Sequence, residues 1–233
     1  MSERKPYIIV IEGLDGSGKE TTKLTLEKLL KDKNYSVLTA SFPMYERWHS
    51  FLVKWFLKGK FGKSPYSIPP KLACLFYTVD RFFGYHFYLK KFIELQEDLT
   101  GGFHFIIFDR YSTSNMLYQA ARGKNYYDKL KIVDFINWIE HKLLKLPKPN
   151  KVFFLKNSAI ESREAMKNRE QLDILEQDLV YQKNVDSFSD VLIYYQNWFP
   201  IATRNYVEPY ERYTPEQIAQ TIFEHIEDWA KRF

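Results

Sequence analysis

The stretch YIIVIEGLDGSGKETT, residues 7–22, decides the fold class. It opens with a short β-branched run, YIIVI at 7–11, and passes through a glycine-rich turn into helix-like sequence. Gly13, Gly18 and Lys19 fit the phosphate-binding pattern G-x-x-x-x-G-K-[ST]. Placed between a strand and a helix, the backbone N–H groups of such a loop surround phosphate oxygens, and the helix N-terminus adds favourable partial charge. A nucleotide site is therefore favoured over an ordinary strand–turn–helix junction.

The loop departs from the pattern at one position, which concerns the metal. After the lysine a hydroxyl is expected to hold magnesium, but this chain carries Glu20. Thr21 lies one residue further round the helix, so its hydroxyl is rotated by about 100° and cannot simply substitute. Magnesium must then use other oxygens, from Asp109 or from Glu20 itself. We expect the following loop residues to contact ATP: Gly13, Leu14, Asp15, Gly16, Ser17, Gly18, Lys19, Glu20 and Thr21.

Three further apolar runs predict the rest of the sheet. They are SVLTASF (36–42), FHFIIF (103–108) and KVFFL (151–155), and long helix-competent segments separate them. Near-continuous apolar strands alternating with helices are typical of a parallel sheet covered on both faces. The prediction is one domain over 1–233 with a three-layer α/β P-loop fold, in which helices flank a parallel five-stranded sheet.

Two helical regions are also predicted. The last helix has a capping-box start at Thr214, Pro215 and Gln217. Its buried stripe would be Ile218, Ile222, Ile226 and Trp229. Residues 46–100 are mainly helical and dense in aromatic side chains, which we expect to serve the core and a subunit interface.

Composition narrows the classes of function. The chain has 233 residues, of which 45% are hydrophobic, and no apolar run approaches membrane-spanning length. Its 34 basic residues are interleaved with 29 acidic ones, so the net charge of +5 suits a pocket for small polyanions as well as a nucleic acid. The single cysteine, Cys74, and a polar start suggest a soluble, cytoplasmic protein without a membrane partner. We expect no nucleic-acid partner, because such a partner would leave the phosphate loop unexplained and no long basic block is present.

A second landmark, DRYSTSNMLYQAARG, begins at Asp109. Asp109 and Arg110 follow the predicted strand 103–108, at the edge where open α/β sheets bind ligands. Arg110 is suited to a bidentate phosphate contact, and the Asp109 carboxylate to a magnesium shell.

Taken together, these pieces resemble the thymidylate kinase family over almost the whole chain. The resemblance rests on segments in a shared order and spacing: IEGLDGSGK at 11–19, FP at 42–43, FYTVDR at 76–81, DRYSTSNMLYQ at 109–119, LPKPNKVFFL at 146–155 and NREQLDILEQD at 168–178. It implies a parallel sheet with helices on both sides, a lid over the phosphates and a homodimer.

The resemblance also implies roles in binding dTMP. Asp15 would contact the 3′-hydroxyl, Arg110 would hold the acceptor phosphate, and Tyr118 would lie where a ribose 2′-hydroxyl needs space. Arg81 would reach the thymine edge, and a ring four positions earlier, Tyr77, would stack on the base, although Phe76 beside it leaves that choice open. The other matching pocket positions are Phe42, Pro43, Ser114 and Asn115.

The lid would be the segment 161–178. Some related kinases carry an arginine in the loop and others supply cations from the lid, and Gly16 in the loop suggests the second style here. Arg169 is the main candidate for a lid cation and Lys167 the second, whereas Arg163 fits the spacing less well. The expected catalytic set is Lys19, Arg110, Asp15, Arg169 and Lys167.

The predicted activity is magnesium-dependent transfer of the γ-phosphoryl group of ATP to dTMP. An acceptor phosphate is already anionic at neutral pH, so the site needs positioning and charge neutralisation instead of a general base. The nearest alternatives are another nucleoside monophosphate kinase or a deoxynucleoside kinase, which would need a carboxylate base such as Asp15 or Glu12. Two further alternatives are a single-stranded nucleic-acid-binding module and a nucleotide-binding protein without turnover because of Glu20.

Overall fold

The central sheet has five strands in the order β2-β3-β1-β4-β5, and every neighbouring pair is parallel. A computed structural model describes residues 5–165, 167, 172–205 and 211–231. The strands are β1 (Tyr7–Gly13), β2 (Val37–Ser41), β3 (Phe105–Asp109), β4 (Lys151–Lys156) and β5 (Phe199–Ala202). The predicted three-layer α/β class with a parallel five-stranded sheet is confirmed.

The sequence runs located four of these strands to within two residues at each end. The exception, β5, has only four residues, includes Pro200 and lies at the edge of the sheet. Proline cannot donate to the strand ladder and is therefore confined to such edges. With only four residues, one of them a proline, β5 has no apolar run long enough to recognise in the sequence.

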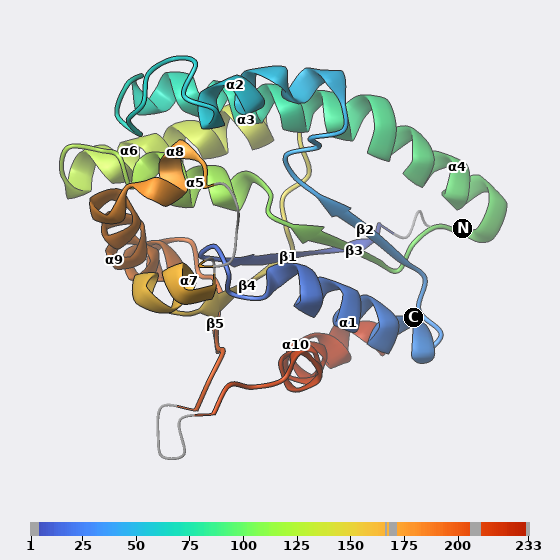
Figure 1. Ribbon diagram of the computed structural model, residues 1–233. Helices are drawn as coiled ribbons and strands as arrows, with labels where there is room; N and C mark the ends of the chain where they lie inside the picture. The colour runs from blue at the N-terminus through green and yellow to red at the C-terminus, as the bar shows by residue number, and fades with distance from the viewer. Residues whose placement is uncertain (1–4, 166, 168–171, 206–210, 232–233) are drawn as a thin grey trace.

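Helices cover both faces of the sheet (Figure 1). The helical elements, with η marking 3₁₀ and π segments, are α1 (Lys19–Asp32), η1 (Trp48–Ser50), α2 (Phe51–Leu57), α3 (Pro70–Phe83), η2 (Gly84–Leu89), α4 (Lys90–Thr100), α5 (Ser112–Ala120), α6 (Tyr126–Asn137), η3 (Trp138–Leu143), α7 (Ala159–Ala165), α8 (Ile174–Gln177), α9 (Leu179–Tyr195) and α10 (Pro215–Ala230). Helices α1 and α10 lie on one face, and the α2–α6 group lies on the other.

Alternation along β1 divides the core between these faces. Ile8 and Val10 belong to the cluster beneath α3 and α5, whereas Ile9 and Ile11 belong to the cluster beneath α1 and α10. Because successive strand residues point to opposite faces, a strand covered on both sides must be apolar throughout. This is why YIIVI reads as an uninterrupted apolar run.

The last helix follows its predicted cap. Thr214 Oγ1 accepts a hydrogen bond from the Gln217 N–H at 3.3 Å, and Gln217 Oε1 accepts one from the Thr214 N–H at 2.8 Å. Ile218, Ile222 and Ile226 are buried as expected, and Trp229 is partly buried.

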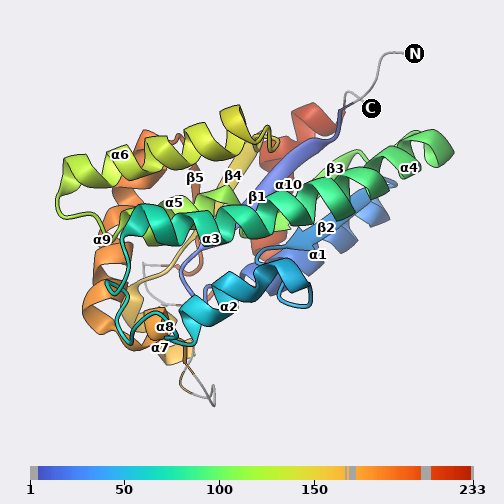
Figure 2. The same ribbon diagram turned by 90° about the horizontal axis from the view of Figure 1, so that it is seen from above.

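The aromatic region 46–100 is mainly helical, as predicted, with a non-helical stretch at 58–69. Helix α3 continues through the π segment η2 into α4, so that residues 70–100 form one long arm (Figure 2). The arm extends past the sheet at its α4 end, and no residue of α4 is buried. At its other end the arm contacts α2, α5 and α6 through α3.

Candidate active site

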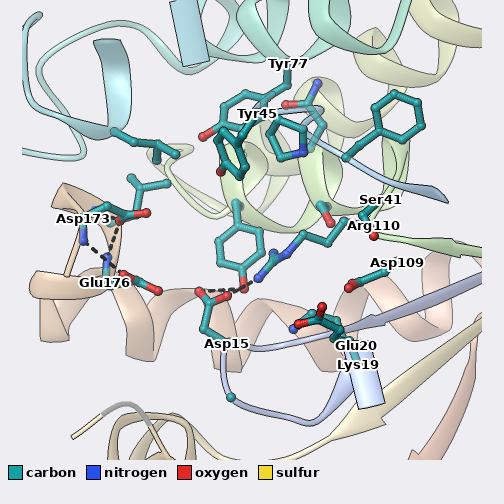
Figure 3. A pocket seen from close by; sticks show the side chains of 18 of the residues that line it. Asp15, Lys19, Glu20, Ser41, Tyr45, Tyr77, Asp109, Arg110, Asp173 and Glu176 are labelled. Atoms are coloured by element: carbon teal, nitrogen blue, oxygen red, sulfur yellow. Dashed lines mark hydrogen bonds and ion pairs between the residues drawn. The ribbon is translucent and has the colours of Figure 1, made fainter. Parts of the chain in front are cut away.

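A cavity of about 620 Å³ opens where β1, β2 and β3 end. Its wall combines the glycine-rich loop, the ends of β2 and β3, α3, α5 and the α7–α8 segment. Figure 3 shows Lys19, Asp109 and Glu20 on one side of this cavity and Tyr45 and Tyr77 on the opposite side. The carboxyl ends of parallel strands therefore bring the predicted phosphate and base residues to one place.

The loop has the backbone of a phosphate cradle. Gly16 and Gly18 have φ angles of 74° and 89°, which favour glycine, and no side chain caps the start of α1. Free N–H groups at a helix start are ready partners for an anion. Lys19 is 7% exposed, and its Nζ donates to the carbonyls of Gly13 at 3.0 Å and Leu14 at 2.6 Å.

The charge of Lys19 is tuned by its surroundings. Burial, followed by the nearby positive charge of Arg110, lowers the pKa of Lys19 to about 8, although Asp15, Glu12 and Asp109 oppose this shift. The lysine is therefore charged at neutral pH and becomes neutral in mildly alkaline solution.

Asp15, Arg110 and Tyr118 form a network from three different elements. Arg110 Nη2 donates to Asp15 Oδ1, and the Tyr118 hydroxyl donates to Asp15 Oδ2 at 3.2 Å. Burial alone would raise the pKa of Asp15, but the charges of Arg110 and Lys19 outweigh it and hold this pKa below its ordinary value. Figure 3 shows the Asp15 and Arg110 side chains pointing toward one another. The site thus holds an ionised carboxylate beside two cations.

The chain turns sharply after β3 to place Arg110. The φ angle of Arg110 is 62°, in the left-handed region that an arginine rarely adopts, and its N–H donates to the Ile11 carbonyl at 3.3 Å. Such strain is typical of functional sites, where the surrounding fold enforces it.

Asp109 and Glu20 are the two predicted magnesium-binding residues. Both line the cavity, and Asp109 Oδ1 is buried without a hydrogen-bond partner among the described residues. An unpaired buried carboxylate oxygen fits a hard cation such as magnesium. Within the described residues, no group of three or more His, Cys, Asp or Glu side chains could hold a metal by itself. Any metal there would need oxygens from nucleotide and water as well.

On the base side, the structure separates the two candidate rings. Tyr77 lines the cavity, whereas Phe76 is buried against Phe61 and Phe56, with centroids 5.2 and 6.3 Å away. Phe42 and Pro43, joined by a cis peptide bond, also line the cavity. Of the two rings, only Tyr77 lines the cavity.

Sequence reasoning missed several lining residues, among them Tyr45 and Gln119. Tyr45 follows the FP motif by two residues and faces the cavity, where burial raises its pKa to about 12. Gln119, at the end of the recognised DRYSTSNMLYQ segment, also lines the cavity. Tyr45 would have been included by extending the FP motif by two residues, whereas Gln119 already belongs to a recognised segment but was not singled out.

Arg81 lines the cavity and is fixed by an ion pair with Glu140, which does not line it. Its Nε and Nη2 donate to the two carboxylate oxygens of Glu140 at 2.7 and 2.6 Å. Burial would lower the pKa of Arg81 and raise that of Glu140, but their mutual attraction reverses both shifts, so both groups stay charged. Sequence reasoning missed Glu140, although it continues the buried stripe of Ile132 and Ile136 at four-residue spacing.

Asn115 and Ser114 from α5 also line the cavity. Asn115 Nδ2 donates to Glu140 Oε1 at 2.9 Å and to the Cys74 carbonyl at 3.0 Å, while its Oδ1 accepts no hydrogen bond from any described residue. The Ser114 hydroxyl donates to Glu12 Oε2 at 2.6 Å. Glu12 is fully buried and also accepts from Thr113, so it supports α5 and does not line the cavity.

The expected lid segment closes one side of the cavity with acidic groups. Ala165, Asp173 and Glu176 line the wall. Asp173 caps α8, and burial raises its pKa to about 6, with the charge of Glu176 as the next cause.

The expected lid cations are not among the lining residues. Lys167 is 70% exposed, 4.0 Å from Glu164, and Arg163 is also exposed. Arg169 lies outside the described residues. The roles of Lys167 and Arg169 therefore stay predictions.

Comparison with known proteins gives the family. The family model described as thymidylate kinase matches residues 11–212. The chain belongs to the thymidylate kinase family. The thymidylate kinase of Mycobacterium tuberculosis strain H37Rv is 32% identical over 168 residues, covering 71% of this chain and 73% of the relative. That of Buchnera aphidicola subsp. Baizongia pistaciae is 30% identical over 179 residues, covering 75% of each.

A solved structure supports the same fold. The thymidylate kinase of Candida albicans superposes with a TM-score of 0.63 at 23% identity, covering 97% of this chain and 93% of that one. As a member of the thymidylate kinase family, the chain is an ATP-dependent phosphotransferase with a P-loop fold. None of the described helices combines the length and apolar character needed to cross a membrane.

Proposed function

We propose that this thymidylate kinase transfers the γ-phosphoryl group of ATP to dTMP, giving dTDP and ADP for dTTP synthesis. The observation that carries the proposal is the composition of one cavity. The Lys19 loop lies on one side, Tyr77 lies on the opposite side with Arg110 between them, and Arg81 of the same helix as Tyr77 also lines the cavity. This arrangement suits a nucleoside monophosphate such as dTMP, bound with its base near Tyr77 and its phosphate directed toward an ATP on the loop.

The chemistry needs charge neutralisation more than proton removal. The acceptor phosphate is anionic at neutral pH, so the Lys19 ammonium and the Arg110 guanidinium would draw two polyanions together and stabilise charge on the transferring group. Asp15 would contact the 3′-hydroxyl of dTMP, with Tyr118 filling the space of a ribose 2′-hydroxyl. A deoxynucleoside kinase would need a free carboxylate base. Because Glu12 is buried under two hydroxyl donors, a phosphate acceptor is favoured.

The base wall has a polarity that matches thymine. Arg81 is a donor, and the unpaired Oδ1 of Asn115 is an acceptor. Thymine presents an acceptor at O4 and a donor at N3, whereas cytosine presents the reverse at both positions. A site built for one pattern leaves buried groups unpaired with the other, which gives strong discrimination. Tyr77 would stack on the ring.

A magnesium ion is the expected cofactor, and Asp109 and Glu20 are the residues that would hold it. The unpartnered Oδ1 of Asp109 supports this assignment. When bound, the ion would neutralise negative charge on the phosphates. Arg169 and Lys167 remain the candidates for lid cations.

We further propose a cytoplasmic homodimer. A cytoplasmic location fits a chain with the single cysteine Cys74. The arm α3–α4 exposes large apolar side chains, among them Phe87, Phe92, Leu95 and Leu99. A second copy covering the arm would account for an amphipathic helix with no buried residue.

The activity is tested by incubating the purified chain with ATP and magnesium and separating the products by chromatography. We expect dTMP to be converted to dTDP, with thymidine left unchanged. Conversion of thymidine but not dTMP would indicate a deoxynucleoside kinase instead. Salt-sensitive binding of single-stranded DNA without ADP formation would indicate a nucleic-acid-binding module.

A further inference from the structure

We propose that Glu140 is a positioning residue that sets the hydrogen-bonding polarity of the base wall, and thereby the choice of pyrimidine. The inference rests on the proposed function, because it concerns how the same site distinguishes dTMP from other monophosphates. Glu140 lies in η3, outside the recognised family motifs, and does not line the cavity itself. It acts through Arg81 and Asn115, which do.

The Glu140 carboxylate is completely buried and accepts four hydrogen bonds. Oε1 accepts from Thr78 Oγ1 at 2.8 Å, from Arg81 Nη2 at 2.6 Å and from Asn115 Nδ2 at 2.9 Å, and Oε2 accepts from Arg81 Nε at 2.7 Å. A carboxylate only accepts hydrogen bonds, so it forces every group around it to present a donor. The surrounding side chains are thereby oriented.

This requirement fixes the amide of Asn115. An asparagine can be turned by 180° about its last bond, exchanging a donor for an acceptor at nearly the same shape. Here Nδ2 faces three oxygens, Glu140 Oε1 at 2.9 Å, the Cys74 carbonyl at 3.0 Å and Thr78 Oγ1 at 3.4 Å. The opposite orientation would place Oδ1 against Glu140 Oε1 and the Cys74 carbonyl, neither of which can donate. Oδ1 is buried and accepts no hydrogen bond from any described residue. It is therefore the acceptor of this cavity-lining amide that the N3–H of thymine would satisfy.

The same carboxylate fixes the guanidinium of Arg81. Two parallel hydrogen bonds to Nε and Nη2 hold its plane, which leaves Nη1 without a hydrogen bond to any described residue. Bidentate pairs of this kind define direction as well as charge. Arg81 thus presents a donor, which suits O4 of thymine, beside the acceptor of Asn115.

A purely architectural role would not require a charge at this position. Ile136 and Ile132 occupy the same buried stripe, about one and two helical turns before Glu140. A buried ion pair is often replaced by apolar residues without loss of stability, so a buried Arg–Glu pair is weak support for stability alone. Glu140 also lies in a π segment, Trp138–Leu143, a local widening that often occurs at functional sites.

The central test is Glu140→Gln, which keeps the shape and replaces one acceptor oxygen by an NH₂ donor. At either oxygen position the new donor meets donors, so Arg81 must shift or the Asn115 amide must turn. We expect the KM for dTMP to rise about tenfold and the preference for dTMP over dCMP to fall by about tenfold. The kcat should change by less than about threefold, because the reacting phosphates lie at the other end of the cavity.

Thr78→Val is the matched control. It removes one donor from the same carboxylate and the long 3.4 Å contact from Asn115 Nδ2 to Thr78 Oγ1. The hydrogen bonds that Arg81 and Asn115 donate to Glu140 stay in place. We expect its KM for dTMP and its pyrimidine preference to stay near wild type, although its melting temperature should fall. If Glu140→Gln does not fold, Glu140→Asp is the substitute. It keeps the negative charge but moves the carboxylate one methylene away from Arg81 and Asn115, so the KM for dTMP should also rise.

The outcomes separate this inference from the proposed function. A wild-type enzyme that does not prefer dTMP overturns both. A wild-type enzyme that prefers dTMP, with a folded Glu140→Gln variant of unchanged KM and preference, overturns the inference alone. A loss confined to kcat also overturns it. A double-mutant cycle gives a further criterion. Because Glu140 is proposed to act through Arg81, adding Glu140→Gln to an Arg81→Ala variant should raise the KM for dTMP much less than Glu140→Gln does in the wild type.

Discussion

Arg110 donates a hydrogen bond to the Asp15 carboxylate and, in the proposed reaction, also binds the acceptor phosphate. Its unusual backbone angle and its contact with Asp15 hold the guanidinium over the loop, and its centre lies 5.3 Å from the Tyr118 ring. A lysine there would keep the charge but lose the planar, forked donor set. At the scale of single residues, the site is thus a set of fixed charges.

Removing Arg110 should therefore damage catalysis more than binding of ATP. We expect Arg110→Ala to lower kcat/KM for dTMP by about a thousandfold, because it removes charge stabilisation at the transferring group. Steady-state kinetics with dTMP as the varied substrate measure the loss. Tyr118→Phe, which keeps the ring and loses one hydrogen bond to Asp15, is the control and should lose less than about tenfold. A loss below tenfold in Arg110→Ala would contradict the role.

The lowered pKa of Lys19 predicts a pH dependence of ATP binding. Because this pKa is about 8, the free site loses the lysine's positive charge as the pH rises through that value. The Kd for ATP should increase between pH 7 and pH 9.5, as measured by calorimetry. Lys19→Arg keeps its charge over this range, so its Kd should be nearly flat relative to its own value at pH 7. Parallel curves for the two proteins would rule out Lys19 as the titrating group.

At the scale of elements, the loop and the lid segment are in direct contact. Ser162 of α7 donates a hydrogen bond to the Asp15 carbonyl. A Cβ on Gly16 would lie 2.7 Å from Ala165 Cβ, closer than atoms can pack. The glycine in the loop thus permits α7 to rest on the phosphate cradle. Loop and lid geometry are therefore linked.

A pair of alanine substitutions isolates this contact. Gly16→Ala should lower both the melting temperature and kcat, because it adds a clash with α7 to the backbone strain. Gly18→Ala carries comparable strain at φ 89°, but its Cβ would meet nothing within 4 Å. Ala165→Gly should partly restore Gly16→Ala and leave Gly18→Ala unchanged. Equal effects and no restoration would show that α7 does not matter.

The capping residue of α8 offers a test by protonation. Burial and Glu176 raise the pKa of Asp173 to about 6, above its value in the unfolded chain, so the folded state loses stability as the pH rises toward 7. Asp173→Asn keeps the cap without the charge. We expect it to stabilise the protein by about 1–3 kcal/mol at pH 7 and by almost nothing at pH 4. Urea unfolding measures both; destabilisation at pH 7 would contradict the assignment.

The sequence predicted elements better than partners, for a physical reason. Strand runs such as YIIVI and the Thr214 cap are local patterns, and the structure has both. Glu140 meets Arg81 across 59 residues, and Ser162 meets Asp15 across 147, so no local spacing reveals these contacts. The choice between Phe76 and Tyr77 likewise depends on which side of α3 faces the cavity.

For the whole molecule, the unburied helix α4 predicts self-association. Leu95 and Leu99 are 53% and 68% exposed on the arm that extends past the sheet. We expect the combined change Leu95→Glu and Leu99→Glu to convert a dimer to a monomer, as measured by analytical ultracentrifugation. Tyr194→Glu, at an 89% exposed residue of α9, is the control and should leave the dimer intact. A wild-type monomer at all concentrations would refute the dimer.

The most direct test of the central claim is a set of specificity constants. ADP formation from ATP and magnesium is measured with dTMP, dUMP, dCMP, dGMP and AMP as acceptors. We expect kcat/KM to be highest for dTMP and at least about a hundredfold lower for dCMP, because the hydrogen-bonding edge of cytosine does not match the donor of Arg81 and the acceptor of Asn115. A cytidine or purine monophosphate that equals or exceeds dTMP would contradict it.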